Sequence, residues 1–536
     1  MRTDGVWLCV VGAGLAGLCG LPYVVSALFG PVDLQRVGTF WFLRDFSQYE
    51  AAMREGASQS GWLIHDHLSA EPHSGAFVYP LYVAAGKLSG LLGLSAPTAF
   101  IALEWLGRLT VVGSLYAFVS TFLKSTRQRR LAVLLTLATL GLDAVAALLR
   151  LLLDASGVHA LDGLLPDTIN PYLEMSSLGV LFSGPHLMLG LALTLVCAPL
   201  YLRAIDSSTG RHAVWLALLG LAILGLSLVH PFNAPMLVSV LVAHATLTGR
   251  AAWPSGLVAG LALAPMALYS LLLFQFDAFW SGTYGIQNIM PSPPPWSLPL
   301  DFGLVMLAAP LAWRAVRSWP QERRVLLVLW VGLGLLWMYA PVPYQRRLAF
   351  GVQPALAILG AVGLLEMNAS LRAHAVALVW RRVINYAAAV AGLSTSVLVY
   401  VSLVASALLN QPAEVYLWSR PEAAAAAWLG ANSTVQDVVM ASTDFGNPLA
   451  GDIDGRVVLG HTVATLQSDQ KARLVREFYA VDAPSQDRTD IMRLSGATII
   501  ALGPAERALG ITDLSSQPGL RLVYDSQGVQ FFRVGA

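Results

Sequence analysis

Charged residues are scarce in this chain. Only 12% of its 536 residues are Asp, Glu, Lys or Arg, whereas a soluble globular protein has about 25%, and 56% are hydrophobic. This composition excludes a soluble cytosolic enzyme and predicts a protein that crosses a membrane several times. The 33 Lys and Arg residues nearly balance the 32 Asp and Glu residues, for a net charge of +1. That balance excludes a nucleic-acid binder that works through bulk charge.

Cysteine is also scarce, with three residues in the whole chain. Cys9, Cys19 and Cys197 all lie inside apolar runs. They predict neither a disulfide framework nor a thiolate metal site, and we interpret them as packing residues within the membrane.

Long apolar runs are what the chain has in abundance. A helix needs roughly 20 apolar residues to cross about 30 Å of hydrocarbon. About eleven runs approach this length and predict an all-α polytopic domain over 1–409: 6–30, 96–123, 131–153, 178–202, 213–229, 231–249, 253–276, 299–316, 325–341, 348–366 and 385–409. We interpret the first run as a retained anchor rather than a cleaved signal peptide, because it is too long and no small-residue cleavage site precedes a soluble sequence.

The orientation of the spans follows from the basic residues. Lys and Arg collect in alternate connections, for example at 124–130 and 314–324, whereas the connections at 154–177 and 277–298 contain none. The positive-inside rule therefore predicts a cytoplasmic N-terminus and, with eleven spans, an extracytoplasmic C-terminal domain in the plasma (inner) membrane.

Three segments outside the spans have a distinct composition. The first outer loop, 31–95, is long and includes the short apolar stretch 76–94, which we expect to lie as a helix along the outer surface. From 410 to 536 the chain has the composition of a soluble α/β domain, with strands predicted at 437–441, 457–461, 497–503 and 521–534. The run PSPPPW at 291–296 is incompatible with a helix, and we expect it to form a stiff lid.

A glycine-rich motif near the N-terminus matches a nucleotide-binding fingerprint by letter only. VVGAGLAGL at 10–18 has the G-x-G-x-x-G spacing, but it lies inside an uncharged apolar run. The fingerprint requires a strand, a turn and a helix in a soluble βαβ unit. We interpret these glycines as positions of close helix packing, and we expect no nucleotide or redox cofactor.

Asp45 in the first outer loop is our candidate catalytic base. It lies in RDFSQYEAAMREG, shortly after the first span, on the face where a lipid-linked substrate presents its head group. A carboxylate there can accept a proton from an acceptor hydroxyl. The alternative is a surface residue that caps a helix over 46–55.

Histidines and acids cluster further along the same loop. WLIHDHLSAEPH contains His65, Asp66, His67 and His73, a set of side chains that suits a divalent cation. The spacing matches no firm ligand pattern, so an ordinary polar loop is the favoured interpretation. Glu71 in the same stretch is a candidate substrate-binding residue.

Further candidates lie at the predicted outer membrane edge. Arg346 and Arg347 follow Tyr344 in a short outer loop, against the positive-inside trend, which indicates a negatively charged ligand such as a lipid phosphate. His186 and His230 lie at or near the ends of spans on the same face, where polar side chains are often functional. The alternatives are interfacial anchoring for the arginines and a hydrogen bond to a neighbouring carbonyl for each histidine.

These features together resemble the GT-C superfamily of polytopic membrane glycosyltransferases. The resemblance is one of layout, and it covers the whole chain: an inside N-terminus, an acidic residue soon after the first span, surface helices before the second span, and a soluble outer domain at the end. Several stretches are similar to bacterial members of unassigned substrate: EPHSGAFVYPLYVAAGKLSGLLGLS, SGPHLMLGLAL, HPFNAP, QNIMPSPPPW and QRRLAFGVQPALAILGAVGL.

The resemblance implies transfer of a sugar from a polyprenyl-phosphate carrier to a glycan, lipid or protein acceptor outside the cytoplasm, usually with inversion at the anomeric carbon. It carries the acidic base of the first loop onto Asp45. RDF stands where the oligosaccharyl and mannosyl branches have two adjacent acids, so metal dependence and the acceptor stay open. Two other classes also stay open, a lipid or solute transporter (flippase) and a non-catalytic envelope assembly protein.

Overall fold

The computed structural model describes residues 2–31, 33–37, 43–157, 165, 172–206, 211–409 and 416–535. The chain divides into two compact units. Unit 1 comprises Met1–Leu21, Glu104–Ser270 and Ile289–Ala405, and unit 2 comprises Pro22–Leu103, Leu271–Asn288 and Ser406–Ala536. Each unit is therefore assembled from segments that lie far apart in the sequence.

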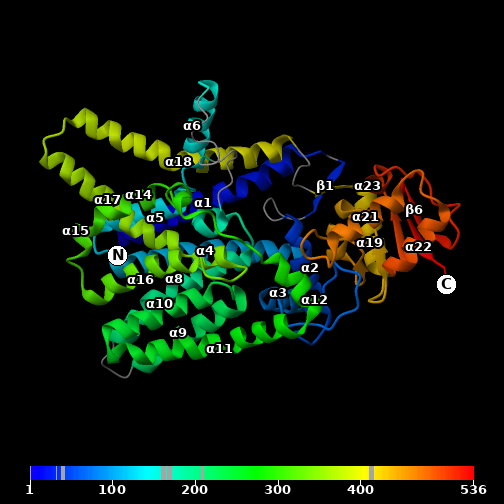
Figure 1. The fold of residues 1–536 in the computed structure, drawn as a ribbon, viewed down its shortest axis with the longest axis horizontal. Helices are drawn as coiled ribbons and strands as arrows, with labels where there is room; N and C mark the ends of the chain where they lie inside the picture. Colours follow the sequence, from blue (N-terminus) through cyan, green and yellow to red (C-terminus); the bar gives the residue numbers. More distant parts are fainter. Residues whose placement is uncertain are drawn as a thin grey trace. The chain divides into compact units, whose positions relative to one another are not determined.

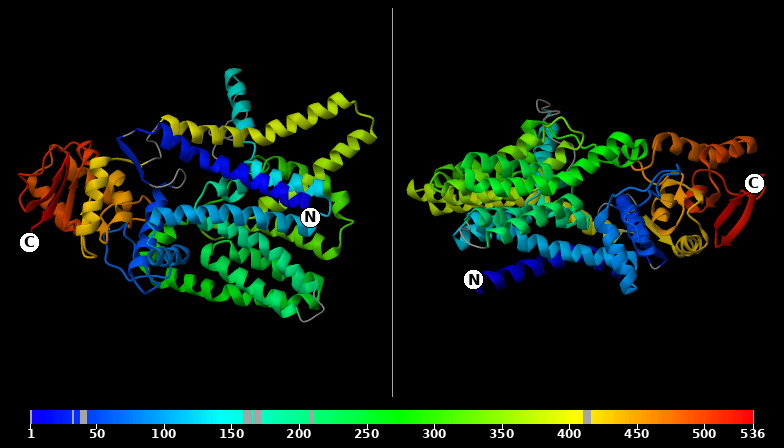
Figure 2. Two further views of the ribbon diagram at one scale, coloured as in Figure 1. Left: turned by 180° about the vertical axis from the view of Figure 1, so that it is seen from behind. Right: turned by 90° about the horizontal axis from the view of Figure 1, so that it is seen from below.

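All the regular elements in the described residues of unit 1 are helices (Figure 1). Its helices, four of which are shared with unit 2, are α1 (Arg2–Phe29), α4 (Ala96–Phe122), α5 (Thr126–Ala138), α6 (Asp143–Ala155), α7 (Ser177–Leu181), α8 (Pro185–Asp206), α9 (His212–Val229), α10 (Ala234–Thr248), α11 (Trp253–Phe276), α13 (Leu298–Asp301), α14 (Leu304–Ala308), α15 (Trp313–Val316), α16 (Gln321–Trp337), α17 (Val352–Ala373) and α18 (Leu378–Leu409). Figure 2 shows α8 and α9 as neighbouring antiparallel helices.

The prediction of about eleven spans is not confirmed. Within the described residues, seven helices are long and apolar enough to cross a membrane, or up to nine if each of two bent pairs counts as one span. Every predicted run coincides with a helix or a bent pair, but α10 has 15 residues and α16 has 17. Helices of these lengths rise about 22 to 26 Å, which is short of the hydrocarbon thickness.

The two bent spans break at glycines that pack against each other. The α5–α6 pair bends by 57° and the pair formed by Pro295–Asp301 and Leu304–Val316 bends by 101°. Gly141 and Gly303 adopt positive φ angles of 94° and 61° at these breaks. A Cβ on Gly303 would lie 2.9 Å from the Cα of Gly141, and the backbone amide of Leu142 donates to the carbonyl of Leu300 at 2.8 Å. Glycine is needed at both positions because the backbones touch.

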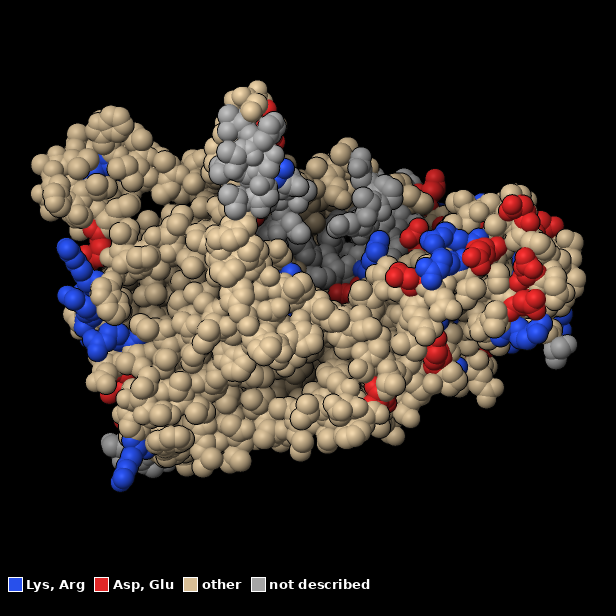
Figure 3. Space-filling model, in the orientation of Figure 1, with Lys and Arg blue, Asp and Glu red and all other residues tan. Residues whose placement is uncertain are grey.

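Basic side chains gather at one end of unit 1 (Figure 3). Asp4, near the start of α1, pairs with Arg129 at 2.7 Å and with Arg130 at 3.1 Å. The N-terminal end of α1 therefore lies beside the basic start of α5. In Figure 3 blue side chains gather at the end of unit 1 where Figure 1 places α15, while most of the visible surface of the helices is uncharged.

Unit 2 joins the predicted first outer loop to the C-terminal domain. Its further elements are β1 (Leu34–Val37), α2 (Leu43–Ser58), α3 (Pro80–Leu92), α12 (Ala278–Trp280), β2 (Tyr416–Ser419), α19 (Arg420–Asn432), β3 (Val438–Met440), α20 (Thr443–Asp452), β4 (Arg456–Val457), α21 (Ser468–Tyr479), α22 (Ser485–Ser495), β5 (Ile499–Leu502), α23 (Pro504–Arg507), β6 (Leu520–Ser526) and β7 (Val529–Val534). Strand β1 pairs with β2 in an antiparallel ribbon that the sequence did not predict.

The C-terminal sheet has five strands in the order β4-β3-β5-β7-β6. Strands β4, β3 and β5 are parallel, whereas β7 is antiparallel to both β5 and β6. Alternate residues of the buried strands face opposite sides, so Val439 and Phe531 pack with α19 and α20 while Val438 and Phe532 pack with α21 and α22. A strand lies at each predicted position, but β4 covers only Arg456–Val457 of the run predicted at 457–461, and β6 is largely exposed.

Helix α3 corresponds to the predicted surface helix at 76–94. It has 13 residues, too few to span a membrane, and it buries Tyr82 and Val83 against unit 2. A Cβ on Gly86 would lie 2.0 Å from the carbonyl oxygen of Met53, so α2 and α3 pack with their backbones in contact. This close packing fixes α2, the helix that carries Asp45.

Candidate functional site

Asp45 lies in the first turn of α2 and is held by two side chains from distant parts of unit 2. The Nε2 atom of His461 is 3.2 Å from Oδ1 of Asp45, and Nε2 of Gln287 donates to the same oxygen at 3.3 Å. The side chain of Asp45 is 24% exposed and that of His461 is 6% exposed. The carboxylate is therefore oriented by protein donors and still reaches solvent.

The loop after β4 sets the proton position on His461. The backbone amides of Val463 and Ala464 both donate to Nδ1 of His461, each at 3.2 Å. Because Nδ1 accepts, the ring proton is assigned to Nε2, which donates to Asp45. Thr465 closes the same loop by accepting from the amides of Gly460 and His461.

A second contact from the C-terminal domain anchors the first turn of α2. The amide nitrogen of Asn447 in α20 donates to the carbonyl of Arg44 at 3.1 Å, and its amide oxygen accepts from Ser47 at 3.0 Å. Asn447 is completely buried. One turn further along, a Cβ on Gly451 would lie 2.7 Å from a carboxylate oxygen of Glu50, so α20 and α2 are closely packed.

Beside Gln287 lies a cleft of about 350 Å³, counting its open mouth. Gln48, Tyr79, Trp280, Tyr284 and Gln287 contribute to its lining. The hydroxyl of Tyr79 lies 2.7 Å from the amide oxygen of Gln48 and 3.2 Å from that of Gln287. The amide nitrogen of Gln48 is buried without a hydrogen-bond partner.

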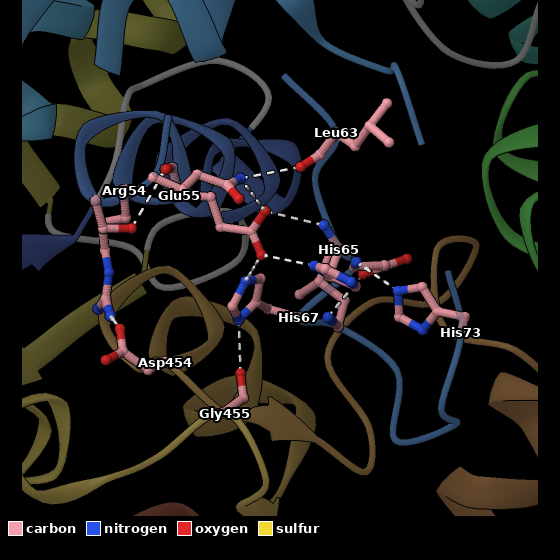
Figure 4. Close-up of polar contacts among 12 residues, drawn as sticks. Arg54, Glu55, Leu63, His65, His67, His73, Asp454 and Gly455 are labelled. Carbon is pink, nitrogen blue, oxygen red and sulfur yellow. Dashed lines mark hydrogen bonds and ion pairs between the residues drawn. The ribbon is translucent and has the colours of Figure 1, made fainter. Parts of the chain in front are cut away.

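The side chains of the predicted cation cluster do not converge on one point. Among the described residues, no three His, Cys, Asp or Glu side chains form a group that could hold a metal ion. Figure 4 shows instead the carboxylate of Glu55 between His65 and His67, at 3.3 Å and 3.1 Å. The other ring nitrogen of His67 lies 2.6 Å from the carbonyl of Gly455.

The remaining members of that cluster are also engaged by the protein. His73 accepts from the amide of Asp66 at 2.8 Å and faces the carbonyl of Glu71 with its other nitrogen, also at 2.8 Å. Its ring stacks on Phe279 at 3.7 Å. Both nitrogens of His67 and both of His73 therefore have protein partners, which is the physical reason that they do not face a common ion.

These contacts set the protonation of the cluster. Burial alone would raise the pKa of Glu55, but the hydrogen bonds from His65 and His67 outweigh it and lower that pKa to about 2. The bond to Glu55 raises the pKa of His65. Burial lowers the pKa of His73 to about 4 and raises that of Asp66 to about 6. Glu55, which the sequence did not single out, is the centre of the network.

Glu71 is bound within unit 2. The ammonium of Lys471 lies 2.7 Å from each of its carboxylate oxygens, and Ser69 donates to it at 2.6 Å. Burial would raise the pKa of Glu71, but Lys471 and Ser69 lower it. Its contacts are those of a structural ion pair, and its predicted substrate-binding role stays a prediction.

Unit 1 contains a separate group of buried polar atoms around His230, the residue that follows α9. The ring of His230 is 1% exposed, stacks on Phe350 at 4.6 Å and lies 6.4 Å from the ring of His186. Both ring nitrogens of His230, the amide oxygen of Asn233 and Nε of Arg347 are buried without a hydrogen-bond partner. Buried polar groups normally have partners, so such a concentration indicates a place for a polar ligand or ordered water.

The two candidate arginines have different surroundings. Arg346 donates from Nε to Glu174 at 3.1 Å, and its guanidinium lies 4.7 Å from the ring of Tyr172. The guanidinium of Arg347 lies over the ring of Phe232 at 5.1 Å. The ring of Tyr344 also lies 5.1 Å from the ring of Phe232. Glu174 partly neutralises Arg346, so Arg347 is the better-placed cation for an anionic ligand.

The PSPPPW segment packs against the loop that carries these arginines. The amide of Met290 donates to Pro343, the amide of Arg346 donates to Met290, and Ser292 donates to the carbonyl of Met338. The segment therefore supports the Arg346 loop within unit 1. Its predicted role as a lid stays a prediction.

Sequence reasoning did not single out the partners of Asp45, although it did name His186 and Arg347, which lie near His230. His461 and Asn447 lie in stretches without a recognisable motif, and Gln287 was quoted only as the first residue of QNIMPSPPPW. The signal that identifies them is a contact across hundreds of residues, which a single sequence does not contain.

Comparisons with known proteins identify the fold. No family model and no curated protein matches the chain. The oligosaccharyltransferase of Archaeoglobus fulgidus, tethered to an acceptor peptide, matches with a TM-score of 0.52 and 10% identity over 91% of this chain and 68% of that chain. The same archaeal enzyme, AglB, in complex with an inhibitory peptide and a dolichol-phosphate, matches with a TM-score of 0.50 and 10% identity over 91% of this chain and 69% of that one.

A mycobacterial arabinofuranosyltransferase, AftD, matches with a TM-score of 0.52 and 16% identity over 98% of this chain. This chain spans 42% of the length of AftD. These proteins are GT-C membrane glycosyltransferases, and at such low identity the likeness establishes the fold alone. The chain thus shares its fold with these membrane glycosyltransferases, and the apolar helices indicate an integral membrane protein.

Proposed function

We propose that this chain is an integral membrane glycosyltransferase that moves a sugar from a polyprenyl-phosphate carrier to an acceptor hydroxyl on the extracytoplasmic side. The observation that carries the proposal is Asp45, a partly exposed carboxylate in the first turn of α2 that His461 and Gln287 orient through one oxygen. The dolichol-phosphate and the acceptor peptide bound to AglB support a lipid-linked donor and a separate acceptor.

The chemical step needs one base and one site for the departing phosphate. Asp45 accepts the proton of the acceptor hydroxyl while that oxygen forms the new bond to the anomeric carbon of the sugar. The bond between this carbon and the carrier phosphate breaks with inversion, and the polyprenyl phosphate leaves with the bonding electrons. No nucleotide takes part in this step.

The group around His230 is our proposed site for the carrier phosphate. Arg347 and the imidazole of His230 supply donors that have no protein partner, and α8 begins at Pro185, directly before His186. The first turn of a helix attracts anions because its backbone amides are free and its dipole is positive there. Arg346, already bound to Glu174, would position this loop rather than be the main phosphate ligand.

The proposed orientation follows from charge. The ion pairs of Asp4 with Arg129 and Arg130 join the N-terminal end of α1 to the start of α5, which is rich in Arg. We place this end in the cytoplasm and the C-terminal domain outside the plasma membrane. Cysteine labelling from each side of intact cells would test this orientation.

The central test is transfer by the purified protein in lipid nanodiscs with a radiolabelled polyprenyl-phosphate sugar and a panel of glycan, lipid and peptide acceptors. Asp45→Asn should lower kcat by about 10²- to 10⁴-fold, the usual contribution of general-base catalysis. Asp33→Asn is the matched control, because Asp33 is an exposed acid in the same loop. Normal turnover by Asp45→Asn would refute the proposed base.

The phosphate site has its own test. Arg347→Ala should raise the KM for the carrier sugar, and Arg347→Lys should restore part of the affinity because it keeps the charge. If Arg347→Ala has an unchanged KM for the carrier sugar, Arg347 does not bind the carrier phosphate. Movement of intact labelled carrier across sealed vesicles, without transfer, would favour the flippase alternative over the enzyme.

A further inference from the structure

The two protein contacts of Asp45 converge on one of its carboxylate oxygens. His461 and Gln287 both approach Oδ1, at 3.2 Å and 3.3 Å. Among the described residues, none forms a hydrogen bond or an ion pair with Oδ2. The two oxygens therefore have different surroundings, and the one without protein donors retains the stronger tendency to accept a proton.

The hydrogen bonds of His461 leave its Nε2 atom as the donor. Its Nδ1 accepts from two backbone amides of its own loop, which leaves Nε2 as the N–H that faces Asp45. The hydroxyl of Thr465 donates to the carbonyl of Leu68, which joins the His461 loop to the segment between α2 and α3. His461 is 5% exposed, so it meets the acid from within the protein rather than from the solvent.

The C-terminal domain holds both the first turn of α2 and the side chain of Asp45. Asn447 of α20 holds the first turn of α2 through Arg44 and Ser47, while His461, which follows β4, holds the Asp45 side chain. Backbone and side chain of the acid are thus fixed by the same C-terminal domain. A fixed carboxylate can approach an acceptor hydroxyl in one geometry, which is what an effective base requires.

We infer that His461 is a positioning residue for Asp45: its Nε2–H holds Oδ1, with Gln287 as the second donor, so that Oδ2 is the oxygen that receives the acceptor proton. This inference rests on the proposed function. It assigns the C-terminal domain a role in the chemical step, in addition to any contact with the acceptor.

Two variants of His461 separate positioning from simple packing. His461→Leu fills similar space without a donor, whereas His461→Gln keeps an N–H near the position of Nε2. We expect His461→Leu to lower kcat by about 10- to 100-fold, the usual cost of a misplaced catalytic group, with little change in the KM for the carrier sugar. His461→Gln should recover at least half of that loss on a logarithmic scale. Melting temperatures of both variants, measured in nanodiscs, show whether each is folded.

The outcomes distinguish this inference from the proposed function. If Asp45→Asn is inactive but His461→Leu, folded, turns over normally, the positioning role is wrong and the proposed base stands. If His461→Gln is no better than His461→Leu, the donor is not what matters, and the inference also fails. If Asp45→Asn itself turns over normally, the proposed function is overturned first.

A measurement without activity tests the contact directly. In protein labelled with ¹⁵N-histidine, the Nε2 resonance of His461, identified by its absence in His461→Gln, should report a neutral ring protonated at Nε2. Asp45→Ala should shift this resonance, and Asp33→Ala should not. A resonance that places the proton on Nδ1, or whose chemical shift does not change in Asp45→Ala, would refute the contact.

Discussion

Replacing Glu55 by Gln should destabilise unit 2, and the structure sets the scale. The pKa of Glu55 falls from 4.5 to about 2, chiefly because the hydrogen bonds from His65 and His67 outweigh burial. Each pKa unit corresponds to about 1.4 kcal/mol, so the ionised carboxylate stabilises the folded state by about 3 kcal/mol. The side chain of Glu55 is 17% exposed, so solvent screening reduces this figure little.

The pH dependence has a defined sign. Because the folded pKa of Glu55 is depressed, its contribution is complete above 4.5 and is lost as the pH falls toward about 2. The pKa of His65 is raised, so its contribution is complete below 6.5 and is lost as the pH rises through the folded value. Both contributions are therefore present between pH 4.5 and 6.5, where Glu55→Gln should have its largest effect.

Glu50 on the same helix is the matched control with the opposite sign. Burial, followed by the charge of Asp452, raises the pKa of Glu50. Its ionised form therefore opposes folding as the pH rises above 4.5, and a neutral Gln should be tolerated or should stabilise. The same substitution, about one and a half turns apart on α2, is expected to act in opposite directions.

The assay is thermal unfolding of the purified protein followed by tryptophan fluorescence at pH 6. About 3 kcal/mol corresponds to a fall in Tm of roughly 6 to 12 °C for a unit of this size, and Glu50→Gln should melt at or above the wild-type temperature. Melting of Glu55→Gln at the wild-type temperature, or an equal fall for both variants, would refute the electrostatic reasoning.

Two further predictions follow from close contacts. Glu71→Gln should lower Tm at neutral pH, because it leaves the largely buried ammonium of Lys471 without its carboxylate partner, a change that typically costs about 3 kcal/mol or more; thermal unfolding in detergent checks it. Gly190→Ala should weaken binding of the carrier sugar, because a Cβ there would lie 2.7 Å from the Cβ of His230 and displace its ring, whereas Gly260→Ala, with nothing within 4 Å, should not; binding measured with a fluorescent carrier analogue compares the two.

Much of the fold could be predicted because it depends on local composition. Apolar runs of 20 residues or more became helices, and short runs rich in Val and Ile at 437–441 and 497–503 became β3 and β5. The count of spans was not confirmed, because whether a run becomes one straight helix depends on tertiary contacts. The runs at 131–153 and 299–316 are bent, and the breaks are stabilised where Gly141 and Gly303 touch each other.

Asp45 was identified from its place in the chain, but its surroundings were not. The position of Asp45 after the first span singled out this acid. Its hydrogen-bond donors, Gln287 and His461, lie more than 200 residues further along the chain. The pairing of β1 with β2, which brings the first outer loop to the start of the C-terminal domain, is equally non-local. Such contacts have no signature in composition or period.

The histidines show why local density is a weak guide to function. His65, His67 and His73 form a conspicuous cluster in the sequence, yet the nitrogens of His67 and His73 are all taken up by Glu55 and by backbone groups. His230 stands alone in HPFN, yet both of its nitrogens are buried without a partner. Burying a polar group without a hydrogen bond costs about 1 to 3 kcal/mol, so a folded protein retains one where a ligand or an ordered water supplies the missing contact. The unpaired nitrogens thus make the isolated histidine a better candidate for a substrate contact than the clustered ones, an order that spacing alone would reverse.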